Sequence, residues 1–460
     1  MEAIKSMSTY SEEISSFVSE LKYKDIPKEV IYKAKLHLLD TLGVAISFSR
    51  NSIIKDTVVK TVKELNTNSE STVINSKLSS SSDYAALANA SMIHGQDYDD
   101  THRPGVVHSS SIVVPAALAC GEAREISGES LIETMVSGYE ILARIGMAAN
   151  EGFHKKGMHA TPMCGVFVAS LIAGKVNGLS NKELVNALGV CGSQAAGLQQ
   201  FLIDGSWAKI IHPGWAVHSG IIASKLASNG FTGPLAIFEG ELGFFAAHLG
   251  LKNVKLNFLT KDLRKVWQTL NISMKYYPCC HAIHSFIDGV FFLQKKYNIQ
   301  WQNIKKIICV INPLGAKLVC EPIEVKRTPK TIYGARFSLP YTIAMSLLDG
   351  ELGLKQFSKE RISDNQVFEI TKKVVCINED SFPRTGGNIT IEMEDGNKYH
   401  YLKEHPIGSP LYPLGEHQVL DKFRRNVSDI IPKNRAEQII KSVLNIESID
   451  NIKKLMTLLK

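Results

Sequence analysis

Hydrophobic positions recur at helical spacing through about the first 260 residues. The segment EVIYKAKLHLLDTLGVAIS keeps apolar residues three and four apart, and Pro27 ahead of it suits the first turn of a helix. Thr9 with Glu12, and Ser180 with Glu183, match the pattern of a helix capping box. This part of the chain has no strong strand-like alternation. We therefore predict that it is all helical.

The pattern changes after about residue 265. The runs IKKIICVINP and KKVVCINE are short and rich in β-branched residues, which is typical of strands. The segment NITIEMEDGNKYHYLKE alternates on both sides of Asp395-Gly396, which predicts a hairpin. Helices are expected after Cys280 and around SLPYTIAMSLLDG, and again in the amphipathic segment KNRAEQIIKSVLNI.

The predicted fold class is mainly α, with a large all-α helical domain and a smaller α+β domain. C-terminal helices are expected to return to the helical domain. The predicted boundaries are residues 1–265, residues 266–405 and residues 406–460.

Composition and charge narrow the class of protein. The chain has 460 residues, of which 44% are hydrophobic and 21% charged, as is typical of a globular protein with a sizeable core. The net charge is +7, and the basic residues are scattered along the chain. The sequence has no basic stripe with interleaved aromatic residues, so nucleic-acid binding is disfavoured. Apolar runs such as GVFVASLIAG are shorter than the roughly 18 residues of a membrane span. The start MEAIKSMSTYSEE has no apolar signal core and the first arginine is Arg50, so we expect a cytoplasmic protein.

Several common motifs do not occur. The eight cysteines are dispersed without a C-x-x-C pair, and several, such as Cys309, lie in apolar runs typical of core residues. The chain has no G-x-G, no P-loop and no G-x-S-x-G. A dinucleotide-dependent dehydrogenase, an NTPase and an α/β-hydrolase are therefore disfavoured.

One segment, HGQDYDDTHRPGVVHSSS, concentrates charge ahead of an apolar helix. Three aspartates in four positions repel one another unless cations, hydrogen bonds or water offset them. His94, Asp97, Asp99 and His108 could bind a metal, but metal ligands this close in sequence usually need a second contributor. A solvated loop is the plain alternative. We favour a loop that handles protons and carboxylates.

Three further segments carry candidate chemistry. His159 in GMHATPMCG precedes an apolar helix, whose free N–H groups suit an anion, although a purely structural histidine is the alternative. Lys209 lies in an apolar stretch, where a lysine either reaches water or holds an anion. The segment MKYYPCCHAIHS contains Lys275 and two adjacent cysteines, which rarely bridge one another. Cys280 as a nucleophile has no general base that spacing identifies.

Together these segments resemble the MmgE/PrpD family. HGQDYDDTHRPGVVHSSSIVVPAALA, GMHATPMCG, WAKIIHPGWAVHSG, GFTGPLAIFEGELGFF and MKYYPCCHAIHS follow the family's order and spacing over essentially the whole chain. The family holds 2-methylcitrate dehydratases, cis-aconitate decarboxylases and an iminodisuccinate epimerase. The resemblance implies a helical domain with a smaller α+β lid, a homodimer, and an active site for a di- or tricarboxylate that uses no metal or redox cofactor.

The resemblance also implies site residues. The family's active-site aspartate, threonine, two histidines, two lysines and tyrosine fall on Asp97, Thr101, His108, His159, Lys209, Lys275 and Tyr341. The loop before His108 has one extra residue. At Cys280 the decarboxylase branch carries a histidine, and the cysteine here puts decarboxylation in doubt more than dehydration.

These residues have coherent chemical roles. We expect Lys209, Lys275 and Arg103 to neutralise substrate carboxylates and an enolate-like transition state. His159 and Tyr341 would transfer protons, and Asp97 would orient a histidine or hold water. The favoured function is a cofactor-independent lyase of the 2-methylcitrate dehydratase type. The alternatives are a cis-aconitate decarboxylase, an iminodisuccinate epimerase, and a dimeric carboxylate-binding protein with the fold but without the chemistry.

Overall fold

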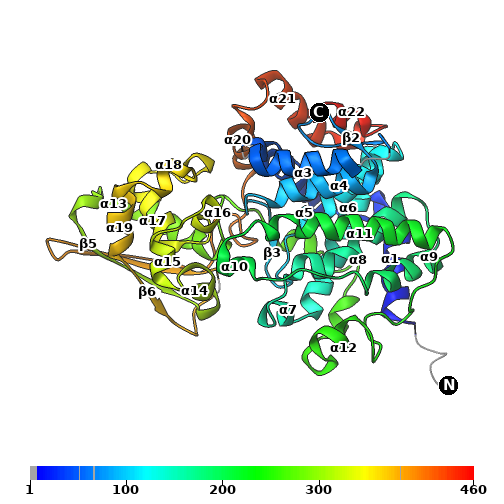
Figure 1. The fold of residues 1–460 in the computed structure, drawn as a ribbon, viewed down its shortest axis with the longest axis horizontal. Helices are drawn as coiled ribbons and strands as arrows, with labels where there is room; N and C mark the ends of the chain where they lie inside the picture. The colour runs from blue at the N-terminus through cyan, green and yellow to red at the C-terminus, as the bar shows by residue number, and fades with distance from the viewer. Residues whose placement is uncertain (1–7, 51, 66–67, 384) are drawn as a thin grey trace.

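The computed structural model describes residues 8–50, 52–65, 68–383 and 385–460. Residues 1–7, which belong to the segment used for the cytoplasmic prediction, lie outside this part. Figure 1 shows a large helical body beside a smaller region that contains a four-stranded sheet. The predicted fold class, mainly α with a smaller α+β region, is confirmed.

The helical body is built mostly from the first half of the chain. Its helices are α1 Tyr10–Glu20, α2 Lys28–Ser47, α3 Ser52–Leu65, α4 Ser82–His94, α5 Ser110–Ala123, α6 Gly128–Ala148, α7 Gly152–Lys155, α8 Ala160–Val176, α9 Asn181–Cys191, α10 Phe201–Asp204, α11 Ala208–Ser228 and α12 Phe244–Leu249. The capping boxes of Thr9 with Glu12 and of Ser180 with Glu183 are confirmed. Pro27 is the N-cap of α2, one residue before the predicted first turn.

The centre of the body is a stack of apolar helices. α8 packs against α11, α5 and α6, and α4 packs against α11 and α5. α5 and α8 are apolar on nearly all sides, which is typical of helices buried in a large core. A Cβ atom at Gly220 of α11 would lie 2.4 Å from the backbone oxygen of Val166 in α8, so only glycine permits this approach. The ends of these close-packed helices are held firmly in place.

The strands of the body are two residues long. β1 (Ser71–Thr72) pairs with β2 (Ser79–Ser80), and β3 (Thr101–His102) pairs with β4 (Ile272–Ser273), both antiparallel. Such short strands have no room for an alternating pattern, which explains why the sequence did not indicate them. The β3–β4 pair brings the aspartate-rich segment beside the segment that leads to Lys275.

The main sheet lies in the smaller region. Its strands, in the order β6-β5-β7-β8, are β6 Val374–Asn378, β5 Ile304–Ile311, β7 Gly387–Met393 and β8 Lys398–Lys403. β5 is parallel to β6, and the other pairs are antiparallel. The predicted hairpin across Asp395-Gly396 is confirmed as the β7–β8 connection, where Gly396 has a φ of 89°. The turn needs a left-handed residue, and glycine supplies it.

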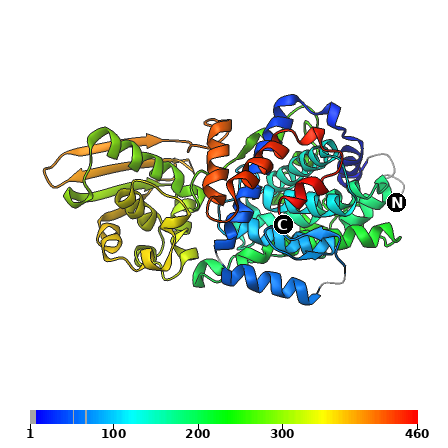
Figure 2. The same ribbon diagram turned by 90° about the horizontal axis from the view of Figure 1, so that it is seen from above.

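Helices pack against this sheet in the manner of an α+β region. They are α13 His284–Tyr297, α14 Pro313–Val319, α15 Ile323–Arg327, α16 Ile332–Ala335, α17 Leu339–Asp349, α18 Lys359–Ile362 and α19 Asn365–Lys373. α13 packs against β7 and β8, and α17 packs against α13 and α19. Figure 2 shows the strands at one end of the molecule, with the helical body at the other.

The C-terminal helices α20 (Glu416–Val427), α21 (Lys433–Leu444) and α22 (Lys453–Thr457) lie on the helical body (Figure 1). α20 and α21 pack against α2, and α22 packs against α5. A buried ion pair of 2.7 Å between Lys422 and Asp40 joins α20 to α2. The exact domain boundaries at residues 265 and 405 stay a prediction.

Short 3-10 turns connect many of these elements: Tyr23–Asp25, Phe48–Arg50, Leu251–Asn253, Leu256–Leu259, Gln268–Asn271, His281–Ile283, Trp301–Asn303, Leu354–Gln356 and Ile446–Ser448. Among the described residues, no helix is both long and apolar enough to cross a membrane. All eight cysteines are free thiols, and seven of them are buried, as expected for core residues.

Candidate active site

Asp97 lies in the turn that follows α4 and is almost fully buried. Its φ of 50° is left-handed, a conformation that aspartate tolerates better than most residues. Lys209 Nζ donates to Oδ1 at 2.5 Å, and Lys275 Nζ donates to Oδ2 at 2.9 Å and to the backbone oxygen at 2.7 Å. Burial alone would raise the pKa of Asp97, but the two ammonium groups outweigh it and hold that pKa well below its usual range. Two cations on one carboxylate leave a surplus positive charge that suits an anion.

Asp99 faces two histidines instead of lysines. Its Oδ2 lies 2.8 Å from His94 Nδ1, at the end of α4, and 3.2 Å from His108 Nδ1, just ahead of α5. Burial opposes ionisation of Asp99, but the facing His108 and His94 rings lower the pKa of its carboxyl. Burial lowers the pKa of His94 to about 4, although Asp99 opposes this shift. His94 is therefore neutral at pH 7, and Asp99 orients both rings.

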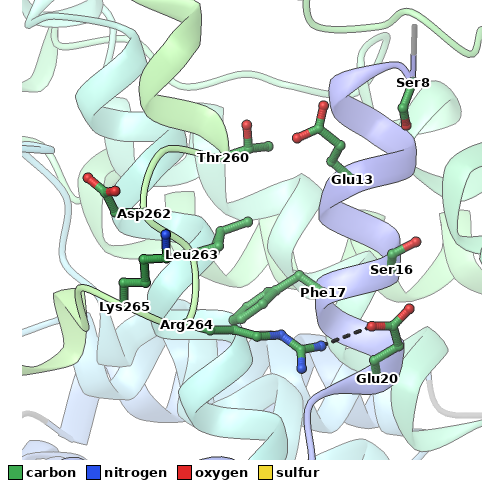
Figure 3. A pocket seen from close by; sticks show the side chains of 10 residues that line it. All are labelled: Ser8, Glu13, Ser16, Phe17, Glu20, Thr260, Asp262, Leu263, Arg264 and Lys265. Carbon is green, nitrogen blue, oxygen red and sulfur yellow. Dashed lines mark hydrogen bonds and ion pairs between the residues drawn. The ribbon is translucent and has the colours of Figure 1, made fainter. Parts of the chain in front are cut away.

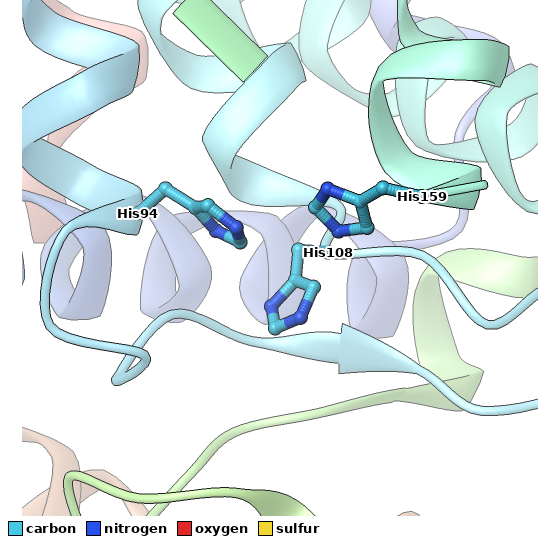
Figure 4. A group of neighbouring side chains, drawn as sticks. All are labelled: His94, His108 and His159. Atoms are coloured by element: carbon cyan, nitrogen blue, oxygen red, sulfur yellow. The ribbon is translucent and has the colours of Figure 1, made fainter. Parts of the chain in front are cut away.

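His159 lies at the N-cap of α8, as the sequence predicted, and is buried. Its ring centroid is 5.4 Å from that of His94 and 6.1 Å from that of His108, and Figure 4 shows the three rings turned toward a common space. Its Nδ1 is 3.2 Å from His212 Nδ1. Burial and the neighbouring His94 and Lys209 lower the pKa of His159 well below its usual value. A neutral imidazole here can accept a proton.

Asp100 has a different, structural environment. It accepts hydrogen bonds from the Ser110 backbone N–H at 2.8 Å and from Ser110 Oγ at 2.5 Å, at the start of α5. His37 Nδ1 of α2 lies 2.8 Å from Asp100 Oδ2. The Asp100 carboxylate thus accepts a hydrogen bond from the first turn of α5. Negative charge is favourable at the N-terminus of a helix because the helix dipole is positive there. Three neighbouring aspartates therefore have three separate sets of partners.

The remaining predicted residues lie around Lys275, with one exception. Thr101 Oγ1 is 2.8 Å from His281 Nδ1, and Arg103 is half-buried on the same segment. Cys280 is buried, and its backbone N–H donates to Arg336 O at 2.9 Å. Burial, followed by the Asp97 charge, raises the pKa of the Cys280 thiol, so it is a poor nucleophile.

Tyr341 is the exception. It is fully buried in α17, and its hydroxyl donates to the backbone oxygen of Gln356 at 2.5 Å. In the described part of the chain, no hydrogen bond joins this hydroxyl to Asp97, His159 or Lys209. Its predicted proton-transfer role stays a prediction.

Sequence reasoning did not single out Tyr333 of α16. Its hydroxyl is buried and has no hydrogen-bond partner among the described residues. Burial raises its pKa well above the usual value, with further contributions from Asp97 and Asp99, so the phenol keeps its proton. The only sequence signal was its place in TIYGARF, directly ahead of the motif that contains Tyr341.

Arg336 was also missed. It is buried, and its Nη1 donates to Gln96 O at 2.9 Å and to Pro278 O at 2.6 Å. These two carbonyls belong to the turn before Asp97 and to the segment after Lys275. Burial lowers the pKa of Arg336 to about 10, which still leaves it charged at pH 7. Arg336 therefore connects the smaller region to both sides of the charged cluster.

Among the residues that the structure describes, two groups of side chains have metal-ligating atoms within 4.8 Å of one another: His94 with His108 and His159, and Asp97 with Asp99 and His108. Asp99 already faces Nδ1 of two of these histidines. The ammonium groups of Lys209 and Lys275 on Asp97 repel a dication. The charge arrangement therefore favours a carboxylate ligand over a metal ion.

A surface pocket of about 520 Å³ lies elsewhere, between α1 and the segment 260–265. Figure 3 shows its side chains, which include the ion pair of Arg264 with Glu20. Its lining includes none of the cluster residues, and this exposed ion pair offers no acid-base chemistry. The buried cluster is the better candidate for an active site.

Comparisons with known proteins place the chain in a family. The models of the MmgE/PrpD N-terminal domain and the MmgE/PrpD C-terminal domain match residues 12–257 and 277–447. A cis-aconitate decarboxylase-like protein of Aspergillus oryzae is 27% identical, covering 97% of this chain and 96% of that protein. The cis-aconitate decarboxylase of Homo sapiens is 26% identical, covering 99% of this chain and 95% of that protein. The 2-methylcitrate dehydratase of Salmonella typhimurium is 21% identical, covering 94% of this chain and 93% of that protein. The chain belongs to the MmgE/PrpD family.

Proposed function

We propose that this MmgE/PrpD lyase acts on a tricarboxylate without a metal or redox cofactor. The observation that carries the proposal is the buried Asp97 carboxylate between Lys209 and Lys275, beside the neutral imidazoles of His94 and His159. The two ammonium groups would bind substrate carboxylates, and the imidazoles would move protons. Both groups act strongly in a closed site that excludes water.

The first reaction to test is decarboxylation of cis-aconitate. Relatives named cis-aconitate decarboxylase are 26% identical and one named a cis-aconitate decarboxylase-like protein is 27% identical, whereas those named 2-methylcitrate dehydratase are 21–22% identical at similar coverage. This order reverses the preference drawn from the sequence. The second candidate is dehydration of 2-methylcitrate, which the cysteine at position 280 favours.

Both reactions place similar demands on the site. When CO₂ leaves, or when a base removes a proton α to a carboxylate, an electron pair spreads onto a carboxylate oxygen and increases its charge. Lys209 and Lys275 would stabilise that charge in the transition state. His159 would deliver the proton that quenches the pair after decarboxylation, or would accept the proton during dehydration. Tyr333, with its protonated phenol, would serve as the second proton donor.

A substrate panel tests the proposal. The purified protein is offered cis-aconitate, 2-methylcitrate, citrate and iminodisuccinate, and products are followed by NMR, by absorbance of the unsaturated acid and by released CO₂. We expect turnover of one tricarboxylate, and a Lys209→Ala, Lys275→Ala double variant as the inactive control. If the protein epimerises iminodisuccinate and turns over none of the tricarboxylates, the proposed function changes from a lyase to an epimerase. Tight binding of these acids without turnover would support the non-catalytic alternative.

We also propose that the protein is a homodimer. Large apolar side chains are exposed near α10 and the start of α11, among them Ile203 (79% exposed) and Trp215 (54%). Exposed large apolar side chains are typical of interaction surfaces where they form one patch. Light scattering on the purified protein should give twice the chain mass, and Ile203→Glu with Trp215→Glu should give a monomer.

A further inference from the structure

His281 lies where the smaller region meets the body, in the 3-10 turn His281–Ile283 just before α13. Its Nδ1 is 2.8 Å from Thr101 Oγ1, in β3 of the body. Its Nε2 is buried and has no hydrogen-bond partner among the described residues. An unpaired buried polar atom is costly, which points to a partner that arrives with a ligand.

The charges around His281 indicate the chemistry of that ligand. Burial, followed by the charges of Lys275, Arg103 and His108, lowers the pKa of His281 to about 3, while Asp97 opposes the shift. The ring is therefore neutral at pH 7 and has one N–H group. The positive charges of Lys275 and Arg103, which act on this ring, also attract an anion. An anion bound beside the ring would need a hydrogen-bond donor.

The contact with Thr101 permits the tautomer in which Nε2 carries the proton. A threonine hydroxyl can donate to Nδ1, and the ring proton then lies on Nε2. In that tautomer Nε2 is a donor on a ring that experiences the positive charges of Lys275 and Arg103. The opposite tautomer would place a buried lone pair there, which no carboxylate could satisfy.

We propose that His281 is a further substrate-binding residue, which donates from Nε2 to a carboxylate oxygen of the tricarboxylate held by Lys209 and Lys275. Thr101 is then a positioning residue that fixes the ring, in place of a direct substrate ligand. The inference rests on the proposed function and adds to it a donor from the smaller region. Substrate binding would thereby join that region to the body.

The tautomer can be measured without substrate. In protein with ¹⁵N-labelled histidine, with the His281 signal assigned by loss in His281→Gln, the ¹⁵N shifts should be those of the Nε2–H form. Thr101→Val should lose this preference, whereas Thr101→Ser keeps the hydroxyl and should retain it. An Nδ1–H form in the wild-type protein would overturn the inference.

Binding of tricarballylate, a saturated tricarboxylate, provides the second test. His281→Phe should weaken its Kd about 10- to 100-fold, the range expected for a hydrogen bond to a charged group. His281→Gln keeps an N–H donor near Nε2 and should lose less. The double variant Thr101→Val, His281→Phe should bind tricarballylate as tightly as His281→Phe alone, because the threonine acts only through the His281 ring.

The outcomes separate this inference from the proposed function. Wild-type binding of tricarballylate with an unchanged Kd in His281→Phe would overturn the role of His281 and leave the lyase proposal intact. Failure of the wild-type protein to bind or turn over any tricarboxylate would overturn both. Thermal unfolding of each variant shows whether it is still folded. We expect His281→Gln to keep the wild-type fold.

Discussion

The two regions of the molecule supply different halves of the charged cluster. The body supplies His94, His108, His159, the aspartates and Lys209 near the ends of long helices, where α4 finishes and where α5, α8 and α11 begin. The smaller region and its connecting segment supply Lys275, His281, Tyr333 and Arg336 from short turns. The body thus supplies His159 and one of the two lysines, and the smaller region with its connecting segment supplies the other lysine and the phenol of Tyr333.

This difference has a consequence for how the site closes. The short turns of the smaller region reach the cluster through a few specific bonds, notably Arg336 to Gln96 O and His281 to Thr101. A segment held by few contacts can move on the timescale of catalytic lids. Substitutions at these few bonds should therefore affect closure of the site, in addition to any effect on the chemical step.

The largest expected effect comes from the body half. His159→Ala should lower turnover by roughly 10²- to 10⁴-fold with little change in KM, because general acid-base catalysis contributes about that much. Steady-state kinetics on the substrate identified by the panel measures both parameters. Near-normal turnover would return His159 to a purely structural role.

Two tyrosines test the other half with the same chemical change. Tyr333→Phe should lower turnover roughly 100-fold if its free phenol donates a proton. Tyr341→Phe should leave turnover within a few-fold and cost stability of about 1 kcal/mol, since it removes the hydrogen bond to Gln356 O. The reverse result would restore Tyr341 as the proton donor predicted from the sequence.

Lys209 should affect binding as well as rate. Lys209→Ala removes a charge that bound substrate and transition state both meet, so KM should rise and turnover should fall, together roughly 10- to 100-fold in kcat/KM. Lys209→Arg should rescue only in part, because a wider planar cation cannot replace a compact ammonium. Full rescue by arginine would show that charge alone matters at this position.

Histidines in both halves should weaken the fold in mild acid. The pKa is about 4 for His94 in the body and about 3 for His281 in the other half, both below the unfolded value of about 6.5. The unfolded chain therefore binds more protons between these values, and the free energy of unfolding should fall as pH drops from about 6.5 toward 4. Urea unfolding at fixed pH values measures this, and ¹H NMR should show both rings neutral at pH 5.5. Ordinary titration near pH 6.5 would contradict the buried environment.

The smallest expected effect is that of chelation. Because the lysines on Asp97 repel a dication, extensive treatment with EDTA should leave activity unchanged, and metal analysis should find no stoichiometric metal. Loss of activity that one divalent ion restores would assign a metal to His94, His108 and His159.

Local signals were enough to predict much of the fold. Capping boxes act within four residues, and the Asp395-Gly396 turn sets its own hairpin, so both could be identified without knowledge of the rest of the chain. The motifs also predicted Asp97, Lys209 and Lys275, which the structure brings together.

Only the tertiary structure decided what each group of the cluster faces. Asp97 and Asp99 are two residues apart, yet Asp97 meets lysines 112 and 178 residues away, whereas Asp99 meets histidines. A left-handed turn at Asp97 redirects the chain at this point, and helix packing brings the distant partners in. Which tyrosine keeps a free hydroxyl depends in the same way on long-range contacts. Sequence alone determined which residue types are present, and packing determined their partners, because hydrogen bonds and charge pairs depend on distances that no local pattern encodes.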